Sequence, residues 1–246
     1  MIQRKRGLIV AGLLAAIVGL VALFPARVAF QWLPPALVQA SGIKGSLWNG
    51  SAQAMMVSGV YVTEVRWTAR PLRLFVGELA LHVVAKPASG FLESDVGIGL
   101  GGRISLRDLQ AAVPLQLFER TVNVRGLRGS GSLSFDRIDI DNGVPVTMKG
   151  NLEVAGLVAP LVSPGSLGGY RAEFFTQESG VVASVEDTDG VIDVAGSLEL
   201  RPDRSYRFLA QIVAKPETPE KLREQMKYLP PANDRGQHEL RVEGTL

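Results

Sequence analysis

Apolar and polar residues alternate one by one over most of the chain from residue 43 onward. A period of two places successive side chains on opposite faces of an extended strand, so the alternation predicts half-buried β-strands. The clearest segments are Leu79–Ala85, Leu133–Ile140, Val194–Leu200, Tyr206–Ile212 and His238–Leu246. The chain is therefore expected to be mainly β.

Turn-forming residues separate these segments. Asp141-Asn142-Gly143, Asp187-Thr188-Asp189-Gly190 and Pro202-Asp203-Arg204 carry residues typical of tight turns. The 27 glycines exceed the usual share of ~7%. Many of them fall inside strand-like segments, where glycine marks bulges, bends or close backbone approach. We therefore expect a curved, mostly antiparallel β-sheet.

Two segments depart from the alternation and predict short helices. Ser105 is a favourable cap for a helix over Leu106–Ala112, which Pro114 ends or kinks. Thr218 caps a second helix, with proline at its first position and an apolar stripe that runs to Leu229. We expect no other helix in the body of the protein.

The N-terminal region differs in kind, because an uncharged apolar run extends from Gly7 to Phe24 directly after Arg4, Lys5 and Arg6. At ~1.5 Å per residue this run is long enough for a slightly thin bilayer core. Cytoplasmic flanks are enriched in Lys and Arg, so we expect the N-terminus inside and the body exported. The alternative is a cleaved signal peptide, whose apolar region is usually shorter and ends at small residues.

These patterns predict a single-pass inner-membrane organisation. We expect a cytoplasmic basic N-terminus at 1–6, a transmembrane helix at 7–24, a linker at 25–42 and a periplasmic β-rich domain at 43–246. The segment 158–169 is rich in Pro, Gly and Ser, and is a candidate boundary inside that domain.

Composition excludes several classes of function. The absence of cysteine excludes thiolate metal sites, thiol nucleophiles and redox motifs. The net charge is only +2 and basic residues do not cluster with aromatic ones, so nucleic-acid binding is not expected. His82 and His238 are the only histidines, and we expect them to be solvated or locally bonded. We expect no catalytic residue, no metal and no cofactor.

Two glycine-containing loops resemble ligand sites only in part. Gly97–Gly102 lacks the helix that must follow a dinucleotide loop, since Arg103-Ile104 continues in an extended pattern. Asp187–Gly190 opens like a calcium loop, but its twelfth position is Leu198 instead of Glu. We expect no ligand at either place and a hairpin turn at Asp187–Gly190.

The most specific motif is Gly45-Ser46-Leu47-Trp48-Asn49-Gly50-Ser51-Ala52. Its two glycines, Gly45 and Gly50, flank an extended Leu47-Trp48 pair. Asn49-Gly50 is typical of a two-residue primed hairpin turn. Tryptophan offers a large apolar area with one N–H that needs a partner. We expect a β-hairpin with Trp48 buried in the core. The alternative is a docking surface for a partner.

A unit of glycine, a small polar residue and leucine recurs along the chain. It occurs as Gly45-Ser46-Leu47, Gly150-Asn151-Leu152, Gly196-Ser197-Leu198 and Gly244-Thr245-Leu246. The intervals are unequal, so the unit is not a solenoid repeat. The recurrence indicates that several strands share the same glycine-containing segment, or that the unit repeats by chance in a glycine-rich β protein.

The motif resembles that of the type II secretion system protein N family, the general secretion pathway N component of Gram-negative bacteria. That family pairs a short N-terminal anchor with a Gly-[Thr/Ser]-Leu-Trp-x-Gly-x-Ala-like pattern, matched here by Gly45–Ala52, with Ser46 where Thr is commoner. The resemblance continues through Val65–Trp67, Leu72–Leu74, Leu106–Leu117, Asp189–Val191, Gly196–Leu200 and Leu240–Leu246.

The resemblance implies an inner-membrane protein whose periplasmic β-rich domain is accessory to secretion of folded proteins across the outer membrane. It implies contacts with other secretion-system proteins and no enzymatic activity. The Gly-x-Leu-Trp-x-Gly pattern also resembles that of AsmA-like envelope proteins, which implies an alternative, a lipid-binding or lipid-conducting groove. A secretion scaffold should pack or cover the concave face of its sheet, whereas a lipid groove should leave that face open and apolar.

The last alternating segment is the candidate edge strand of the sheet, with Leu240, Val242, Gly244 and Leu246 on its inward side. Unpaired N–H and C=O groups of an edge strand can bind another chain by strand addition. We expect this edge to contact a protein partner.

Overall fold

The computed structural model describes residues 19, 23–31, 38–57, 60–87, 89–99, 101–119 and 123–245. The segments expected to be cytoplasmic, at 1–6, and transmembrane, at 7–24, lie outside the described residues, apart from Gly19, Leu23 and Phe24. None of the helices within the described ranges has the length and apolar character needed to cross a bilayer.

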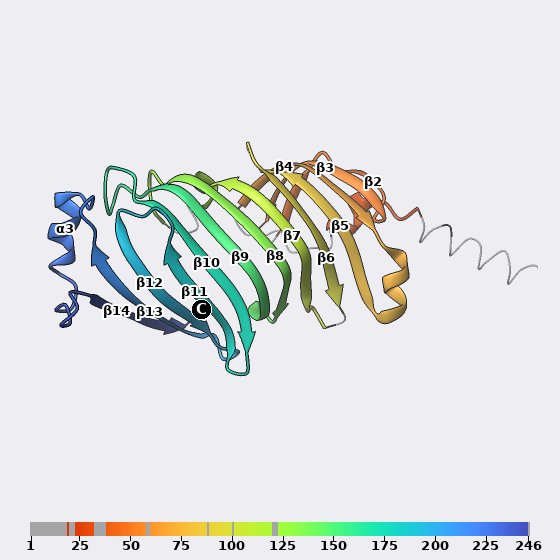
Figure 1. Ribbon diagram of the computed structural model, residues 1–246. Helices are drawn as coiled ribbons and strands as arrows, with labels where there is room; N and C mark the ends of the chain where they lie inside the picture. The colour runs from red at the N-terminus through yellow and green to blue at the C-terminus, as the bar shows by residue number, and fades with distance from the viewer. Residues whose placement is uncertain are drawn as a thin grey trace, which may run out of the picture.

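Fourteen strands, two short α-helices and two 3-10 helices make up the described chain (Figure 1). In chain order they are α2 (Ala26–Gln31), β1 (Val38–Ser41), β2 (Lys44–Gly45), β3 (Asn49–Val57), β4 (Val60–Ala69), η1 (Pro71–Val76), β5 (Glu78–Lys86), β6 (Phe91–Gly99), β7 (Ile104–Pro114), η2 (Leu115–Phe118), β8 (Arg128–Asp141), β9 (Val144–Val158), β10 (Gly168–Gln177), β11 (Gly180–Asp187), β12 (Ile192–Leu200), β13 (Ser205–Ala214), α3 (Glu220–Met226) and β14 (His238–Thr245).

All these strands belong to one sheet. Its order is β1-β3-β4-β5-β6-β7-β8-β9-β10-β11-β12-β13-β14, with β2 paired to β3 beside this path. Every described pairing is antiparallel. From β3 onward each strand lies beside its neighbour in sequence, so short turns suffice as connections. The expectation of a mainly β protein with an antiparallel sheet is confirmed.

The segments predicted from alternation all lie in strands, namely β5, β8, β12, β13 and β14. In β8 the apolar spacing changes from two to three between Phe135 and Ile138, because the register against β9 shifts between Phe135 and Arg137. Such a β-bulge inserts one extra residue, and the alternation then resumes on the same face. Asn142 and Gly143 have φ values of +50° and +80°, as a primed turn between β8 and β9 requires.

The helix predicted over Leu106–Ala112 is wrong, because these residues lie within β7. The register of β7 against β6 contains an extra residue, and Asp108 at this place has a φ of +50°. Leu106 and Leu109 therefore share one face at a spacing of three, which imitates the period of a helix. Ser105, expected as a helix cap, is a buried strand residue.

The second predicted helix is present as α3, and its Leu222 and Met226 are buried. Thr218 does not cap it, because its hydroxyl donates to the Val191 carbonyl at 2.6 Å. Pro219 stands at the cap position without a side-chain hydrogen bond. The helix is therefore held by its apolar face and by the segment before it.

Two segments that were expected to be a linker and a domain boundary lie within the continuous sheet or pack against it. The segment 25–42, expected as a linker, contains α2 and β1. The candidate boundary at 158–169 connects β9 to β10, which pair with each other. The sheet therefore continues without interruption from β3 to β14.

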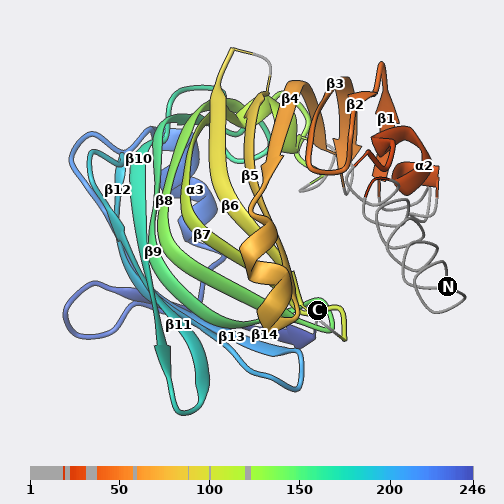
Figure 2. The ribbon, with the colours of Figure 1, turned by 90° about the vertical axis from the view of Figure 1, so that its right-hand side faces the viewer.

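The sheet bends strongly around one face (Figure 2). η2 touches both β4 and β8, which lie four positions apart and would be about 19 Å apart in a flat sheet. Trp67, Phe135 and Val181, from three strands of this single layer, are only 5%, 4% and 1% exposed. Helix α2 adds to the burial of Trp67, and the bend of the sheet brings the other apolar side chains of this face together. The apolar face lies on the concave side of the bend and is here named the inner face. The opposite side is named the outer face.

Candidate functional site

The motif Gly45–Ala52 forms the turn between β2 and β3. Gly45 pairs with Gly50, and the turn is closed by a hydrogen bond from the Ser46 N–H to the Asn49 carbonyl at 2.9 Å. The predicted two-residue turn at Asn49-Gly50 is therefore wrong. Gly45 has a φ of +85°, and an added Cβ would lie 2.5 Å from the Asn49 carbonyl oxygen, so no other residue fits without strain.

Trp67 of β4 is the buried tryptophan at this site. Its ring lies over Gly50, where an added Cβ would come within 2.4 Å of it. Its indole N–H donates to the Ser46 carbonyl at 3.2 Å, and the Phe30 ring packs against it at a centroid distance of 5.5 Å. Trp48 is partly buried and is not among the buried core residues, so Trp67 holds the core position that was expected for Trp48. The motif supplies a glycine platform for a tryptophan from the neighbouring strand.

The same turn holds the residues that follow the N-terminal apolar run. The Leu47 N–H donates to the Phe24 carbonyl at 2.9 Å, and Pro25 forms a β-bridge with Ser46. Ala26, at the start of α2, is 0% exposed and belongs to the apolar cluster around this turn. The motif therefore fixes the start of the sheet to the chain immediately after the apolar run.

Glycines on the inner face recur beneath aromatic rings. Gly150 of β9 pairs with Phe135 and Phe174 on its two sides, and their rings meet at a centroid distance of 5.4 Å. At Gly244 of β14 an added Cβ would lie 2.7 Å from the Tyr206 hydroxyl. At two occurrences of the recurring glycine unit, the missing side chain thus leaves space for an aromatic ring from a neighbouring strand. Gly50 does the same for Trp67 in the motif.

The inner face is covered locally in the described part of the chain. α2 packs beside β3 to β5, while η2, α3 and the loops beside them close one end of the middle strands. Elsewhere the apolar side chains of this face stay partly exposed, and Ile98, Ile104 and Val242 are 42%, 38% and 40% exposed. The inner face is therefore a long apolar surface that the described helices leave partly open.

β14 is the last strand of the sheet and pairs only with β13 among the described residues. Leu240, Val242 and Gly244 lie on the inner face, opposite Ala210, Phe208 and Tyr206. Leu246 lies outside the described residues. On the outer face Glu243 accepts from Arg241 at 2.8 Å and from Arg207 at 2.6 Å. This edge is thus apolar on one side and charged on the other.

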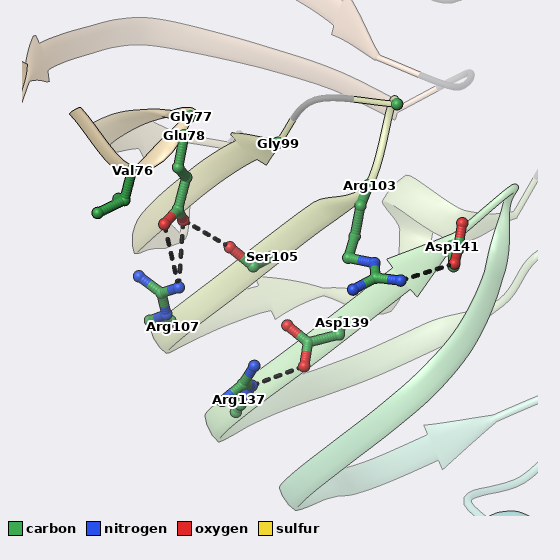
Figure 3. Close-up of a pocket in the computed structure, with 11 residues that line it drawn as sticks. Val76, Gly77, Glu78, Gly99, Arg103, Ser105, Arg107, Arg137, Asp139 and Asp141 are labelled. Carbon is green, nitrogen blue, oxygen red and sulfur yellow. Dashed lines mark hydrogen bonds and ion pairs between the residues drawn. The ribbon is translucent and has the colours of Figure 1, made fainter. Parts of the chain in front are cut away.

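Ion pairs line a hollow of about 630 Å³ on the outer face, next to η1 (Figure 3). The Glu78 carboxylate accepts from the Ser105 hydroxyl at 3.1 Å and from Arg107 at 3.4 Å. Burial alone would raise the pKa of Glu78, but these hydrogen bonds and the nearby guanidinium charges outweigh it and lower that pKa. The other carboxylates drawn are also paired, in Arg137–Asp139 and Arg103–Asp141. Each carboxylate at this hollow is thus paired with a guanidinium group.

Lys215 fastens the segment before α3 to the turn between β11 and β12. Its ammonium group pairs with the Asp187 carboxylate and donates to the Gly190 carbonyl at 3.0 Å. Burial alone would raise the pKa of Asp187, but hydrogen bonds from Lys215 and from the Val194 N–H outweigh it and lower that pKa. The same hydrogen bond raises the pKa of Lys215. Burial and the neighbouring carboxylates raise the pKa of Tyr170 to about 12.

Acid is therefore expected to loosen α3. The lowered pKa of Asp187 contributes stability above its unfolded value of about 3.9, and this contribution is lost as the pH falls through the folded value. Methyl NMR signals of Leu222 and Met226 should move toward their unfolded positions below about pH 4. In Asp187→Asn this acid transition should be absent, and an unchanged transition in that variant would contradict the assignment.

Residues that could support catalysis or metal binding do not converge in the described ranges, where no three His, Asp or Glu side chains are placed to share an ion. His82 Nδ1 lies 2.8 Å from Asp95 Oδ1, and His238 Nδ1 donates to the Pro230 carbonyl at 2.8 Å. Asp187–Gly190 connects β11 to β12, as expected for a hairpin turn. Both histidines are thus bonded to a neighbouring group, and neither belongs to a cluster that could hold a metal ion within the described residues.

The described chain is thus an open, single-layer antiparallel β-sheet with one apolar concave face. Residues 36–241 match the family described as "Type II secretion system (T2SS), protein N", and the chain belongs to this family. Its membership confirms the family suggested by the motif, makes the chain a component of the type II secretion pathway, and implies a location in the cell envelope.

Two curated relatives support this assignment over nearly the full chain. The type II secretion system protein N of Aeromonas hydrophila is 27% identical over 257 aligned positions, which cover 99% of this chain and 100% of the relative. That of Vibrio cholerae serotype O1 is 28% identical over 232 positions, which cover 90% and 91%. No solved structure matches the chain.

Proposed function

We propose that this protein is an accessory, inner-membrane-tethered component that supports export of folded proteins by binding other secretion-system proteins with its sheet. The observation that carries the proposal is β14, which pairs on one side only within the described chain. The N–H and C=O groups along its other side are oriented to accept a further antiparallel or parallel strand.

The alternation of apolar and charged residues along β14 suits a partner strand with the same alternation. A partner strand would add apolar residues beside Leu240 and Val242, and polar residues beside Glu239, Arg241 and Glu243. Main-chain hydrogen bonds would supply affinity, and the two faces would select the pattern of the partner. The other edge strand, β1, has only four residues and offers a shorter template.

Site-specific photo-crosslinking in intact cells tests this proposal. A photoreactive residue at Arg241 should capture a secretion-system protein, because Arg241 lies on the edge strand. The matched control is Glu173, an exposed outer-face residue of β10, which lies inside the sheet between β9 and β11. Equal crosslinking from both positions, or none from Arg241, would count against the edge.

Removal of residues 240–246 gives a second readout. Secretion of folded substrates should fall while the truncated protein still accumulates in membranes, because the deletion removes one edge strand and leaves β3 to β13 paired. Undiminished secretion by a stable truncated protein would remove the reason to assign the edge a role.

A lipid-binding groove is the second candidate, and the partly open inner face favours it. Apolar residues line this face from β3 to β14, and the described helices cover it only locally. A groove of this kind should retain phospholipid through purification. Phe208→Glu, which places a charge on the inner face in the middle of β13, should displace that lipid. If the purified protein holds no lipid, the groove reading fails and the protein-binding reading stands.

A further inference from the structure

η1 exposes apolar side chains in close succession at a tight turn between β4 and β5 (Figure 2). Leu72, Leu74, Phe75 and Val76 are 78%, 44%, 89% and 73% exposed. Single exposed apolar residues are common on soluble surfaces, whereas a contiguous exposed apolar group usually marks an interaction site. Such side chains would gain free energy by leaving water.

The backbone of η1 is prepared for an apolar environment. The Arg73 N–H donates to the Arg70 carbonyl at 3.1 Å, and the Gly77 N–H donates to the Leu74 carbonyl at 3.0 Å. Gly77 closes the turn with a φ of +74°, and Pro71 has no N–H to satisfy. A segment can enter a bilayer only when its backbone polar groups are bonded internally, and this turn largely meets that condition.

The charges at the base of η1 are neutralised in pairs. Arg70 binds Asp95 at 2.7 Å, and Arg73 binds Glu78 at 3.3 Å. Both carboxylate side chains are less than one-fifth exposed, at 19% and 15%. Glu78 also pairs with Arg107, so the base of η1 carries only a small net positive charge, and the binding of its apolar tip to a surface should depend mainly on apolar contact.

η1 also lies at the end of the sheet where the N-terminal apolar run meets it. The Ala69 N–H donates to the Trp48 carbonyl at 2.6 Å, and the adjacent Leu47 N–H donates to the Phe24 carbonyl at 2.9 Å. Two strand spacings, roughly 10 Å, thus separate Phe24, at the end of the apolar run, from Ala69, which lies two residues before η1. A bilayer that holds residues 7–24 must pass close to this rim.

We propose that η1 inserts its apolar tip into the interfacial region of the same bilayer, as a second membrane contact that fixes the tilt of the sheet. The inference rests on the proposed membrane anchoring of residues 7–24. The anchor alone would leave the body free to swivel about one point. With η1 in the interface, the ends of the strands next to the motif face the membrane, and the opposite ends, where α3 lies, face away from it.

Fluorescence of a labelled cysteine tests this proposal. The chain has no natural cysteine, so a single introduced cysteine can be labelled selectively. The full chain with Phe75→Cys carries an environment-sensitive fluorophore and is reconstituted into phosphatidylcholine vesicles with nitroxide-bearing lipids. The control is Leu161→Cys, an apolar residue 69% exposed in the connection between β9 and β10, at the opposite end of the strands.

The label at position 75 should be quenched by lipid nitroxides at least several-fold more than the label at 161, and it should be shielded from iodide. Adding phosphatidylglycerol should change this little, because the basal arginines are paired. A vesicle-bound chain with both labels equally open to iodide would overturn the inference alone. A chain that does not float with vesicles would overturn the anchoring as well. Shielding in cells without lipid quenching would assign η1 to a protein partner and overturn the membrane contact.

Discussion

Replacing Trp67 with alanine is expected to lower the free energy of unfolding by about 3–5 kcal/mol, as for large aromatic truncations in other cores. Trp67 is 5% exposed, and its loss would leave a cavity above Gly50 and remove the packing surface of Phe30. It would also leave the Ser46 carbonyl without the indole hydrogen bond. Chemical denaturation of the purified protein measures the change.

Trp48→Ala is the matched control, since it removes the same type of side chain from the motif itself, whereas Trp67 packs on the motif from β4. Trp48 is half-buried, so we expect a smaller loss, about 1–2 kcal/mol. If Trp48→Ala destabilises the protein as much as Trp67→Ala, the assignment of the core role to β4 is wrong. If Trp48→Ala leaves stability unchanged but impairs secretion, Trp48 belongs to a docking surface.

Replacing Gly150 with alanine is expected to cost at least about 2 kcal/mol, by overpacking and backbone strain together. The φ of Gly150 is +152°, and the new Cβ would lie 2.3 Å from the Ser134 carbonyl oxygen and 2.5 Å from Phe135 Cα. Both neighbours are backbone atoms of β8, so they cannot move without disturbing the sheet. Thermal unfolding followed by far-ultraviolet circular dichroism gives the measurement.

Gly99→Ala provides the comparison for that substitution. Gly99 also lies in a strand, but an added Cβ would be 3.6 Å from its nearest neighbour, the Arg103 carbonyl oxygen, which is ordinary contact. We expect its stability to stay within about 1 kcal/mol of the parent. Equal losses of stability at positions 99 and 150 would mean that the backbone entropy of glycine determines the loss, and not the close contacts of the added Cβ at position 150.

Alternation predicted the strands whose pairing is regular. β12 and β13 pair without a register shift, so the period of two survives over their full length. β7 was missed because its extra residue at Asp108 converts the spacing of the apolar residues from two to three. A bulge depends on the register with a neighbouring strand, and that register is not written in the local pattern.

The motif illustrates a second limit of local reasoning. Asn49-Gly50 has the composition of a primed turn, but Gly50 is needed in the strand as the platform for Trp67, and the turn moves to Ser46–Asn49. The deciding contact joins residues 17 positions apart in sequence. The signal that could have pointed to it was another tryptophan, Trp67, in the next strand-like segment after the motif.

Curvature is the property that sequence alone left most open. The glycine content indicated a bent sheet, but the sign of the bend depends on which face holds the aromatic residues. Gly150 and Gly244 lie on the same face as Phe135 and Tyr206, so small and large residues alternate across strands on the concave side. That pairing became visible only once strand registers were known.

The simple strand order also has a consequence for how the protein is made. Since each strand from β3 onward pairs with the next in sequence, the sheet can grow by stepwise addition of hairpins, without waiting for distant segments. During synthesis, which starts at the N-terminus, β3 could pair with β4 before β13 has been made. Each arriving strand would cover the edge left by its predecessor, which limits aggregation during synthesis. The final edge, β14, is the one that no later described strand covers.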